Sequence, residues 1–131
     1  MMRNGIKIEV SLGELIDKLT ILEIKLDRIC DAHKRRNVET EHAALRAAYE
    51  AHMPGSATLG TLVDTLREVN LRLWTIEDDI RDCERRQEFG PAFVALARSV
   101  YLNNDRRSEL KCEINALLGS KLREEKSYTP Y

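Results

Sequence analysis

The sequence predicts an all-α protein, an antiparallel bundle of three long helices and one shorter helix, preceded by a short extended N-terminal segment. Apolar residues recur at alternating steps of three and four along most of the chain, as on one face of a helix. Hydrophobic residues make up 43% and charged residues 33%, with only six Gly and three Pro, which long helices exclude. A chain of 131 residues suits a single domain, with residues 1–10 as lead-in and 120–131 as C-terminal tail.

The longest predicted helix runs from near Thr58 to about Gln87. One stripe is apolar and consists of Leu59, Leu62, Leu66, Val69, Leu73, Ile76, Ile80 and Cys83. A polar stripe runs beside it and consists of Asn70, Trp74, Glu77, Arg81 and Glu84. A bundle helix needs only the apolar stripe, so we expect any function to involve the polar one.

The first half of the chain begins with residues 6–10, which alternate apolar and polar and predict a short strand or an extended segment pinned to the bundle. Residues 11–14 match a capping box, in which Ser11 caps a helix starting at Leu12 and Glu14 reaches back to the Ser11 amide. The periodicity weakens at residues 31–37, so we expect a bend there, capped by Asp31 or Asn37, and a shorter helix over 38–52.

The second half is divided by two connections. Residues 53–56 form the clearest loop, and the sequence Phe89-Gly90-Pro91 predicts a tight turn with Pro91 in the first turn of the fourth helix. A connection this short makes the third and fourth helices antiparallel neighbours. Gly119 is expected to end the fourth helix, and Tyr128 and Tyr131 would anchor the tail if it is ordered.

Composition argues against several classes of protein. A net charge of −1 with scattered basic residues does not favour nucleic-acid binding. No apolar run approaches the ~20 residues that cross a bilayer, so membrane insertion is not expected. Cys30, Cys83 and Cys112 fit no metal spacing and indicate free thiols in a reducing cytoplasm. We therefore expect no metal site and no cofactor.

The middle of the fourth helix turns polar. The register set by Phe93, Leu96 and Val100 continues into Asn103 and Arg107, where apolar residues are expected. Buried polar groups must pair with each other or with a ligand. One interpretation is a structural network of interhelical ion pairs. Another is a site for an anionic small molecule, with the candidate residues Lys18, Lys25, Glu77, Arg81, Tyr101, Asn104, Asp105 and Lys111, joined by Arg28.

A third interpretation is a small all-α enzyme. The carboxylates Glu77-Asp78-Asp79, with Asp82 and Glu84, could hold Mg²⁺ as in a nucleotide pyrophosphohydrolase, the one case in which a cofactor is expected. The paired Glu-x-x-Glu pattern of such enzymes is absent from the fourth helix, which offers only Asp105, Glu109 and Glu113.

Five stretches carry a family resemblance: Ile8–Leu22, Leu73–Arg81, Val100-Tyr101, Asn104-Asp105 and Glu124–Tyr128. They resemble a family of small bacterial helical proteins of uncharacterised function, a domain of unknown function sometimes associated with glycosyltransferase or repeat-containing proteins. The resemblance implies a link to surface-polysaccharide metabolism and an ordered tail. It also implies that a set of residues acts together, namely Asp17, Lys18, Glu77, Asp78, Arg81, Tyr101, Asn104, Asp105 and Lys126. The first helix is also similar to the opening of helical chorismate mutases, which makes a mutase-like catalyst part of the enzyme interpretation.

Together these observations favour a cytoplasmic binding or accessory module. It would engage an anionic small molecule or a partner protein through a polar cluster between helices. Because the helices are long and seamed, a homodimer is expected.

Overall fold

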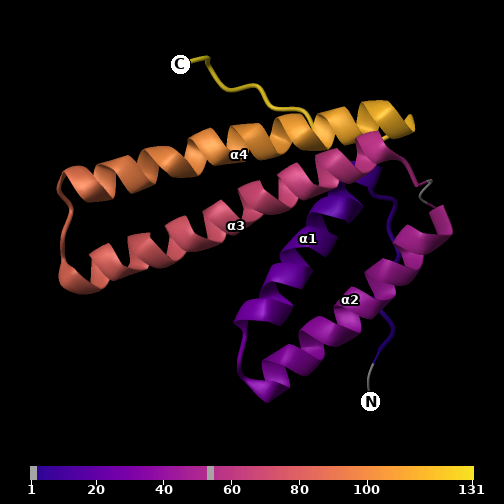
Figure 1. Ribbon diagram of the computed structural model, residues 1–131, viewed down its shortest axis with the longest axis horizontal. Helices are drawn as coiled ribbons and strands as arrows, with labels where there is room; N and C mark the ends of the chain where they lie inside the picture. Colours follow the sequence, from indigo (N-terminus) through magenta and orange to yellow (C-terminus); the bar gives the residue numbers. More distant parts are fainter. Residues whose placement is uncertain (1–2, 53–54) are drawn as a thin grey trace.

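The computed structural model describes residues 3–52 and 55–131 (Figure 1). Its four helices are α1 (Leu12–Arg28), α2 (Ala32–His52), α3 (Ala57–Arg86) and α4 (Pro91–Leu118), and the described ranges hold no strand. The all-α prediction is therefore confirmed. Met53 and Pro54 of the predicted loop lie outside the described residues, as do Met1 and Met2 of the lead-in.

The helix ends follow the sequence closely, with one exception. Ser56 caps α3 through the amide of Leu59, and Gly119 ends α4 in the left-handed conformation with φ of 67°. At α1, the Ser11 hydroxyl accepts the Glu14 amide at 3.1 Å, which confirms the predicted start. The reciprocal half of the capping box is wrong, because the Glu14 carboxylate pairs with Lys111 of α4 instead.

The predicted bend over residues 31–37 is also wrong. Asp31 accepts the amide of His33 at 3.1 Å and caps α2, which begins at Ala32. Its first turns face solvent, so their weak apolar periodicity reflects exposure rather than a break in the helix. With 21 residues α2 is longer than α1, which has 17 and is the shorter helix of the bundle.

The helices are arranged as two hairpins that cross (Figure 1). The long α3–α4 hairpin is antiparallel, as the short connection predicts. Helix α1 contacts all three other helices, whereas α2 packs against α1. The core lies where α1, α3 and α4 meet and consists of Ile16, Leu59, Leu66, Val69, Leu110 and Ile114. Beyond this crossing, the far end of the α3–α4 hairpin extends past α1 and α2.

The two chain ends differ in their packing. Residues 3–10 are extended and exposed, with Ile6 93% and Ile8 76% accessible, so the expected segment is present but is not pinned to the bundle. The tail folds back beside α4 (Figure 1). Within the described ranges, no helix is both long and apolar enough to cross a bilayer.

Close approach of α1 to α4 depends on Gly13. A Cβ at this position would lie 2.7 Å from the Lys111 carbonyl oxygen and 2.9 Å from Asn115 Oδ1. We predict that Gly13→Ala lowers the free energy of unfolding by about 1–3 kcal/mol, because the backbone of α4 must move. Urea denaturation measures this. The control is Gly60→Ala, where the space is open and a gain of up to about 1 kcal/mol is expected. A neutral or stabilising Gly13→Ala would contradict the close approach.

Candidate functional site

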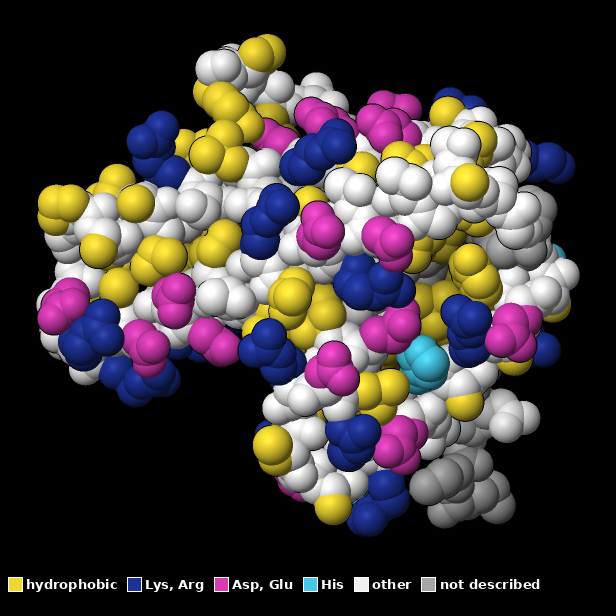
Figure 2. Space-filling view, viewed as in Figure 1, with side chains coloured by type: hydrophobic (Ala, Val, Ile, Leu, Met, Phe, Trp, Pro, Cys, Tyr) yellow, Lys and Arg dark blue, Asp and Glu magenta, His cyan; other side chains and the backbone are white. Residues whose placement is uncertain are grey.

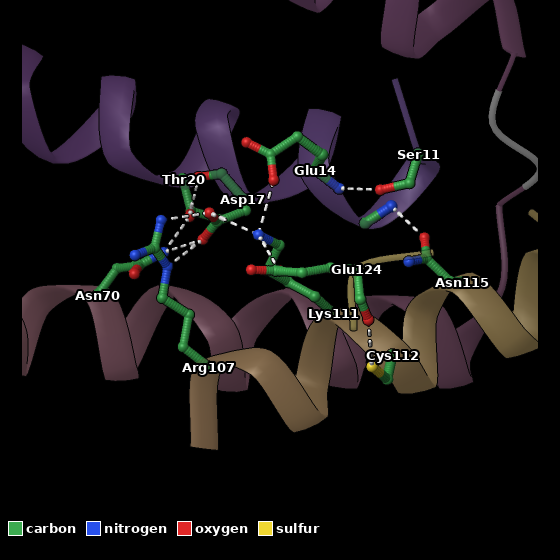
Figure 3. A network of polar contacts seen from close by, with 11 residues as sticks. Ser11, Glu14, Asp17, Thr20, Asn70, Arg107, Lys111, Cys112, Asn115 and Glu124 are labelled. Atoms are coloured by element: carbon green, nitrogen blue, oxygen red, sulfur yellow. Dashed lines mark hydrogen bonds and ion pairs between the residues drawn. The ribbon is translucent and has the colours of Figure 1, made fainter. Parts of the chain in front are cut away.

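A buried carboxylate lies at the crossing of α1, α3 and α4 (Figure 3). Asp17 has no exposed surface, and its Oδ1 accepts hydrogen bonds from Asn70 Nδ2 at 2.9 Å and from Arg107 Nε at 3.0 Å. Arg107 Nη2 donates to the other oxygen at 2.5 Å, which makes the contact bidentate. Asn70 also donates to the Thr20 hydroxyl at 2.8 Å. One carboxylate thus ties three helices together.

Lys111 extends this network toward the tail. Its side chain is 8% exposed, and its Nζ lies 2.6 Å from Glu14 Oε2, 2.9 Å from Glu124 Oε2 and 3.8 Å from Asp17 Oδ2. Three carboxylates therefore face the two cations Lys111 and Arg107, and the network has a net charge of −1. The charge of Lys111 is neutralised by the protein itself.

The ion pairs shift the pKa values of their members. The hydrogen bond to Asp17 raises the pKa of Arg107 above 12.5 despite partial burial. Burial alone lowers the pKa of Lys111, but its hydrogen bonds to Glu14 and Glu124 and the nearby charge of Asp17 outweigh this, so the pKa lies above 10.5. The hydrogen bond from Lys111 lowers the pKa of Glu124 below 4.5. All three groups therefore remain charged across the neutral pH range.

A second contact closes the N-terminal end of the crossing. The fully buried Asn115 accepts the Gly13 amide at 2.7 Å through its Oδ1 and so satisfies one of the free N–H groups of the first turn of α1. Among the described residues, Asn115 Nδ2 is the buried side-chain polar atom that lacks a partner.

A groove of about 460 Å³ lies beside the network, between α1, α3 and α4. Its apolar lining is Ile21, Leu73 and Trp74, and its polar lining is Asn70, Glu77, Asp78, Arg81, Asn104 and Arg107. Arg107 belongs to both the network and the groove. Asp17 occupies its Nε and Nη2, and no hydrogen bond from Nη1 is present within residues 3–52 and 55–131. A fixed guanidinium with free N–H donors is thus available at the groove wall.

The structure brings some of the sequence-predicted residues together and separates others. Glu77, Arg81 and Asn104 line the groove, where Arg81 Nη1 contacts Glu77 Oε2 at 2.5 Å. Lys111 lies in the neighbouring network. Lys18 is exposed and Lys25 is partly exposed, and neither lines the groove.

Tyr101 and Asp105 lie under the tail instead. The Tyr131 hydroxyl donates to Asp105, and the Tyr131 ring packs edge-on against Tyr101 with centroids 5.4 Å apart. This hydrogen bond raises the pKa of Tyr131. Tyr131 is therefore an anchor of the tail, as expected, and Glu124 is a second one. Tyr128 is exposed and contacts the ammonium group of Lys126.

Sequence reasoning left several network residues out of the candidate set, namely Glu14, Asp17, Thr20, Asn70, Arg107 and Glu124. A signal was present in the periodicity. Asp17 lies between the buried positions Ile16 and Leu19, and Asn70 directly follows the buried Val69. Lys18, one residue from Asp17, carries the charge suited to an anion but faces solvent.

The acidic run on α3 does not form a cation cage with its surroundings. Glu77, Asp78 and Asp79 follow one another around the helix, and all three are exposed. In the part of the chain that the structure describes, no group of three or more His, Cys, Asp or Glu side chains is arranged to hold a metal ion.

Comparisons with protein-family models, with curated proteins and with solved structures give no match to this chain.

The Asp17–Arg107 contact predicts an asymmetric mutational effect. Arg107→Gln leaves the fully buried Asp17 without its bidentate partner, and we expect a loss of about 3–5 kcal/mol in the free energy of unfolding. Asp17→Asn should lose less, because the Arg107 side chain is 30% exposed and can reach water. Urea denaturation measures both. The control Arg106→Gln removes an exposed pair and should change stability by less than about 1 kcal/mol. A loss for Arg107→Gln no larger than the control's would contradict this account.

Docking of the tail should depend on pH. Because the pKa of Glu124 is lowered, its contact with Lys111 is fully present above pH 4.5 and is lost as pH falls through the lower folded-state value. Because the pKa of Lys111 is raised, the contact persists up to pH 10.5 and is lost only above it. Amide NMR shifts of residues 123–126 should move toward random-coil values below pH 4.5. Glu124→Gln should abolish this transition, and an unchanged transition in that variant would refute its assignment to Glu124.

Proposed function

We propose that this chain is a binding or accessory module that takes an anionic small molecule into the groove between α1, α3 and α4. The observation that carries the proposal is Arg107, which Asp17 holds in place while Nη1 has no partner among the described residues. A guanidinium oriented in advance loses little conformational freedom when it binds a carboxylate or phosphate. The buried network then has a role beyond stability, because it positions a binding group.

The rest of the lining narrows the class of ligand. Trp74 and Leu73 offer an apolar wall, and the side-chain amides of Asn70 and Asn104 offer donors and acceptors. Arg81 is a second cation, and its exposed pair with Glu77 is weak enough to exchange for a ligand anion. The acidic groups Glu77 and Asp78 suit hydroxyl donors.

These features favour a molecule with an anionic group and a polyhydroxyl or ring portion, such as a sugar phosphate or a nucleotide sugar. The resemblance to a family associated with glycosyltransferase proteins points to the same class of ligand. In this proposal Lys18 and Lys25 are not first contacts. They lie three residues before and four residues after Ile21 on α1, so they flank the groove and raise the local positive charge.

Two further elements belong to the proposal. The chain acts as a homodimer, which its long, seamed helices favour. It works in the cytoplasm, which the free thiols of Cys30, Cys83 and Cys112 support.

The test is thermal unfolding against sugar phosphates, nucleotide sugars, nucleotides and dicarboxylates, each with and without Mg²⁺. A ligand at 100 times its dissociation constant adds about 2.7 kcal/mol of stability. We predict a Mg²⁺-independent shift for one anionic class, lost in Arg107→Lys, which retains the charge beside Asp17 but has fewer donors. Trp74→Leu should weaken the shift, and the control Arg98→Lys, outside the groove, should retain it.

A flat panel with folded protein would contradict the proposal. A shift that requires both Mg²⁺ and a nucleoside triphosphate would overturn it in favour of the pyrophosphohydrolase interpretation. A shift that survives Arg107→Lys unchanged would place binding elsewhere.

A further inference from the structure

Helix α3 carries a second polar stripe on the side away from the groove. Its members follow steps of four and three, the spacing of a coiled-coil contact line, and they are exposed except for the partly exposed Asp82. They are Glu68, Arg72, Thr75, Asp79, Asp82 and Arg86. From Glu68 to Arg86 the stripe spans 18 residues, or about 27 Å at ~1.5 Å per residue.

A hollowed apolar surface lies directly beside this stripe. One hollow, of about 590 Å³, includes Leu71 and Ile76, and the next, of about 460 Å³, includes Leu96, Ala92 and Ala95. Ser99 lines both, so the two hollows form one trough between α3 and α4. Neither hollow is lined by residues of α1 or α2. Figure 2 shows hydrophobic side chains gathered on the hairpin where it extends past the other two helices.

The charges of the stripe are complementary to the same stripe read in reverse. Around a two-fold axis at the level of Glu77, position 68 faces position 86 of a second copy, 72 faces 82, and 75 faces 79. Glu68 then meets an arginine, Arg72 meets an aspartate, and Thr75 meets an aspartate. Each charged pair occurs twice, as a two-fold interface requires.

We propose that a second copy of this chain packs antiparallel along this stripe and the trough beside it. The inference rests on the homodimer of the proposed function and assigns its surface. The pairs within one copy leave these side chains free to change partner. Arg72 and Glu68 are 4.0 Å apart, Arg86 contacts Glu88, and Asp82 contacts Arg85, all in exposed positions where ion pairs are weak.

The antiparallel arrangement also suits the uneven shape of the molecule. Residues 57–71 of one copy, the part of α3 nearest to α1 and α2, lie opposite residues 83–97 of the other. Those residues form the far end of the hairpin, where α3 and α4 extend past the other helices (Figure 1). Each far end therefore has room for the thicker half of its partner, and its half-exposed apolar side chains gain cover.

Sedimentation velocity tests the proposal through charge reversal. Wild-type protein should be a dimer whose dissociation constant rises with salt. Arg72→Glu and Asp82→Arg should each raise that constant about tenfold or more, because each places like charges together twice. The double variant Arg72→Glu/Asp82→Arg restores opposite charges and should recover wild-type affinity. Circular dichroism checks folding, and the control Arg46→Glu, on the exposed side of α2, should change nothing.

Two results would overturn the inference. A monomer at all concentrations removes both the homodimer and its surface. A dimer that ignores the single reversals, or that the double variant fails to restore, retains the homodimer but refutes this surface. Neither result bears on ligand binding in the groove, which thermal unfolding tests separately.

Discussion

A fully buried carboxylate must be paired, and this requirement organises the molecule. Asp17 lies on α1, while its partners Asn70 and Arg107 lie on α3 and α4. Removing such a charge from water costs several kcal/mol unless its hydrogen bonds are satisfied, so the three helices must meet in one register. The apolar core beside it, with Ile16, Leu66 and Leu110, supplies most of the burial but has no comparable directional demand.

The same contact connects the core with the surfaces that act. Arg107 joins Asp17 to the groove, and Lys111, 3.8 Å from Asp17, joins it to Glu124 in the tail. A change in the tail can therefore reach the groove through the paired charges of α4. The far end of the hairpin is independent of this network, since its trough is lined by α3 and α4 alone. Ligand binding and self-association thus use opposite sides of the α3–α4 hairpin.

Much of the fold could be predicted from the sequence, because helical periodicity and caps are local. Ser11, Gly119 and the Pro91 turn mark their helix ends correctly, and the apolar stripe of α3 is largely buried. The site was less predictable, because the angle at which α1 crosses the hairpin decides which polar face is inside. A one-residue difference, Asp17 rather than Lys18, separates a buried anchor from a solvated side chain. The start of α2 was missed because its first turns face solvent and lack an apolar signal.

The most direct test of this account is a double-mutant cycle on Asp17 and Arg107, measured by urea denaturation. If the two charges depend on each other, the loss in Asp17→Asn/Arg107→Gln will be smaller than the sum of the single losses, by about 2–3 kcal/mol. The same cycle on the exposed pair Arg106 and Glu109 should give less than about 1 kcal/mol. Additive losses at Asp17 and Arg107 would show that the pair is not coupled, and the account of α1 docking would fail.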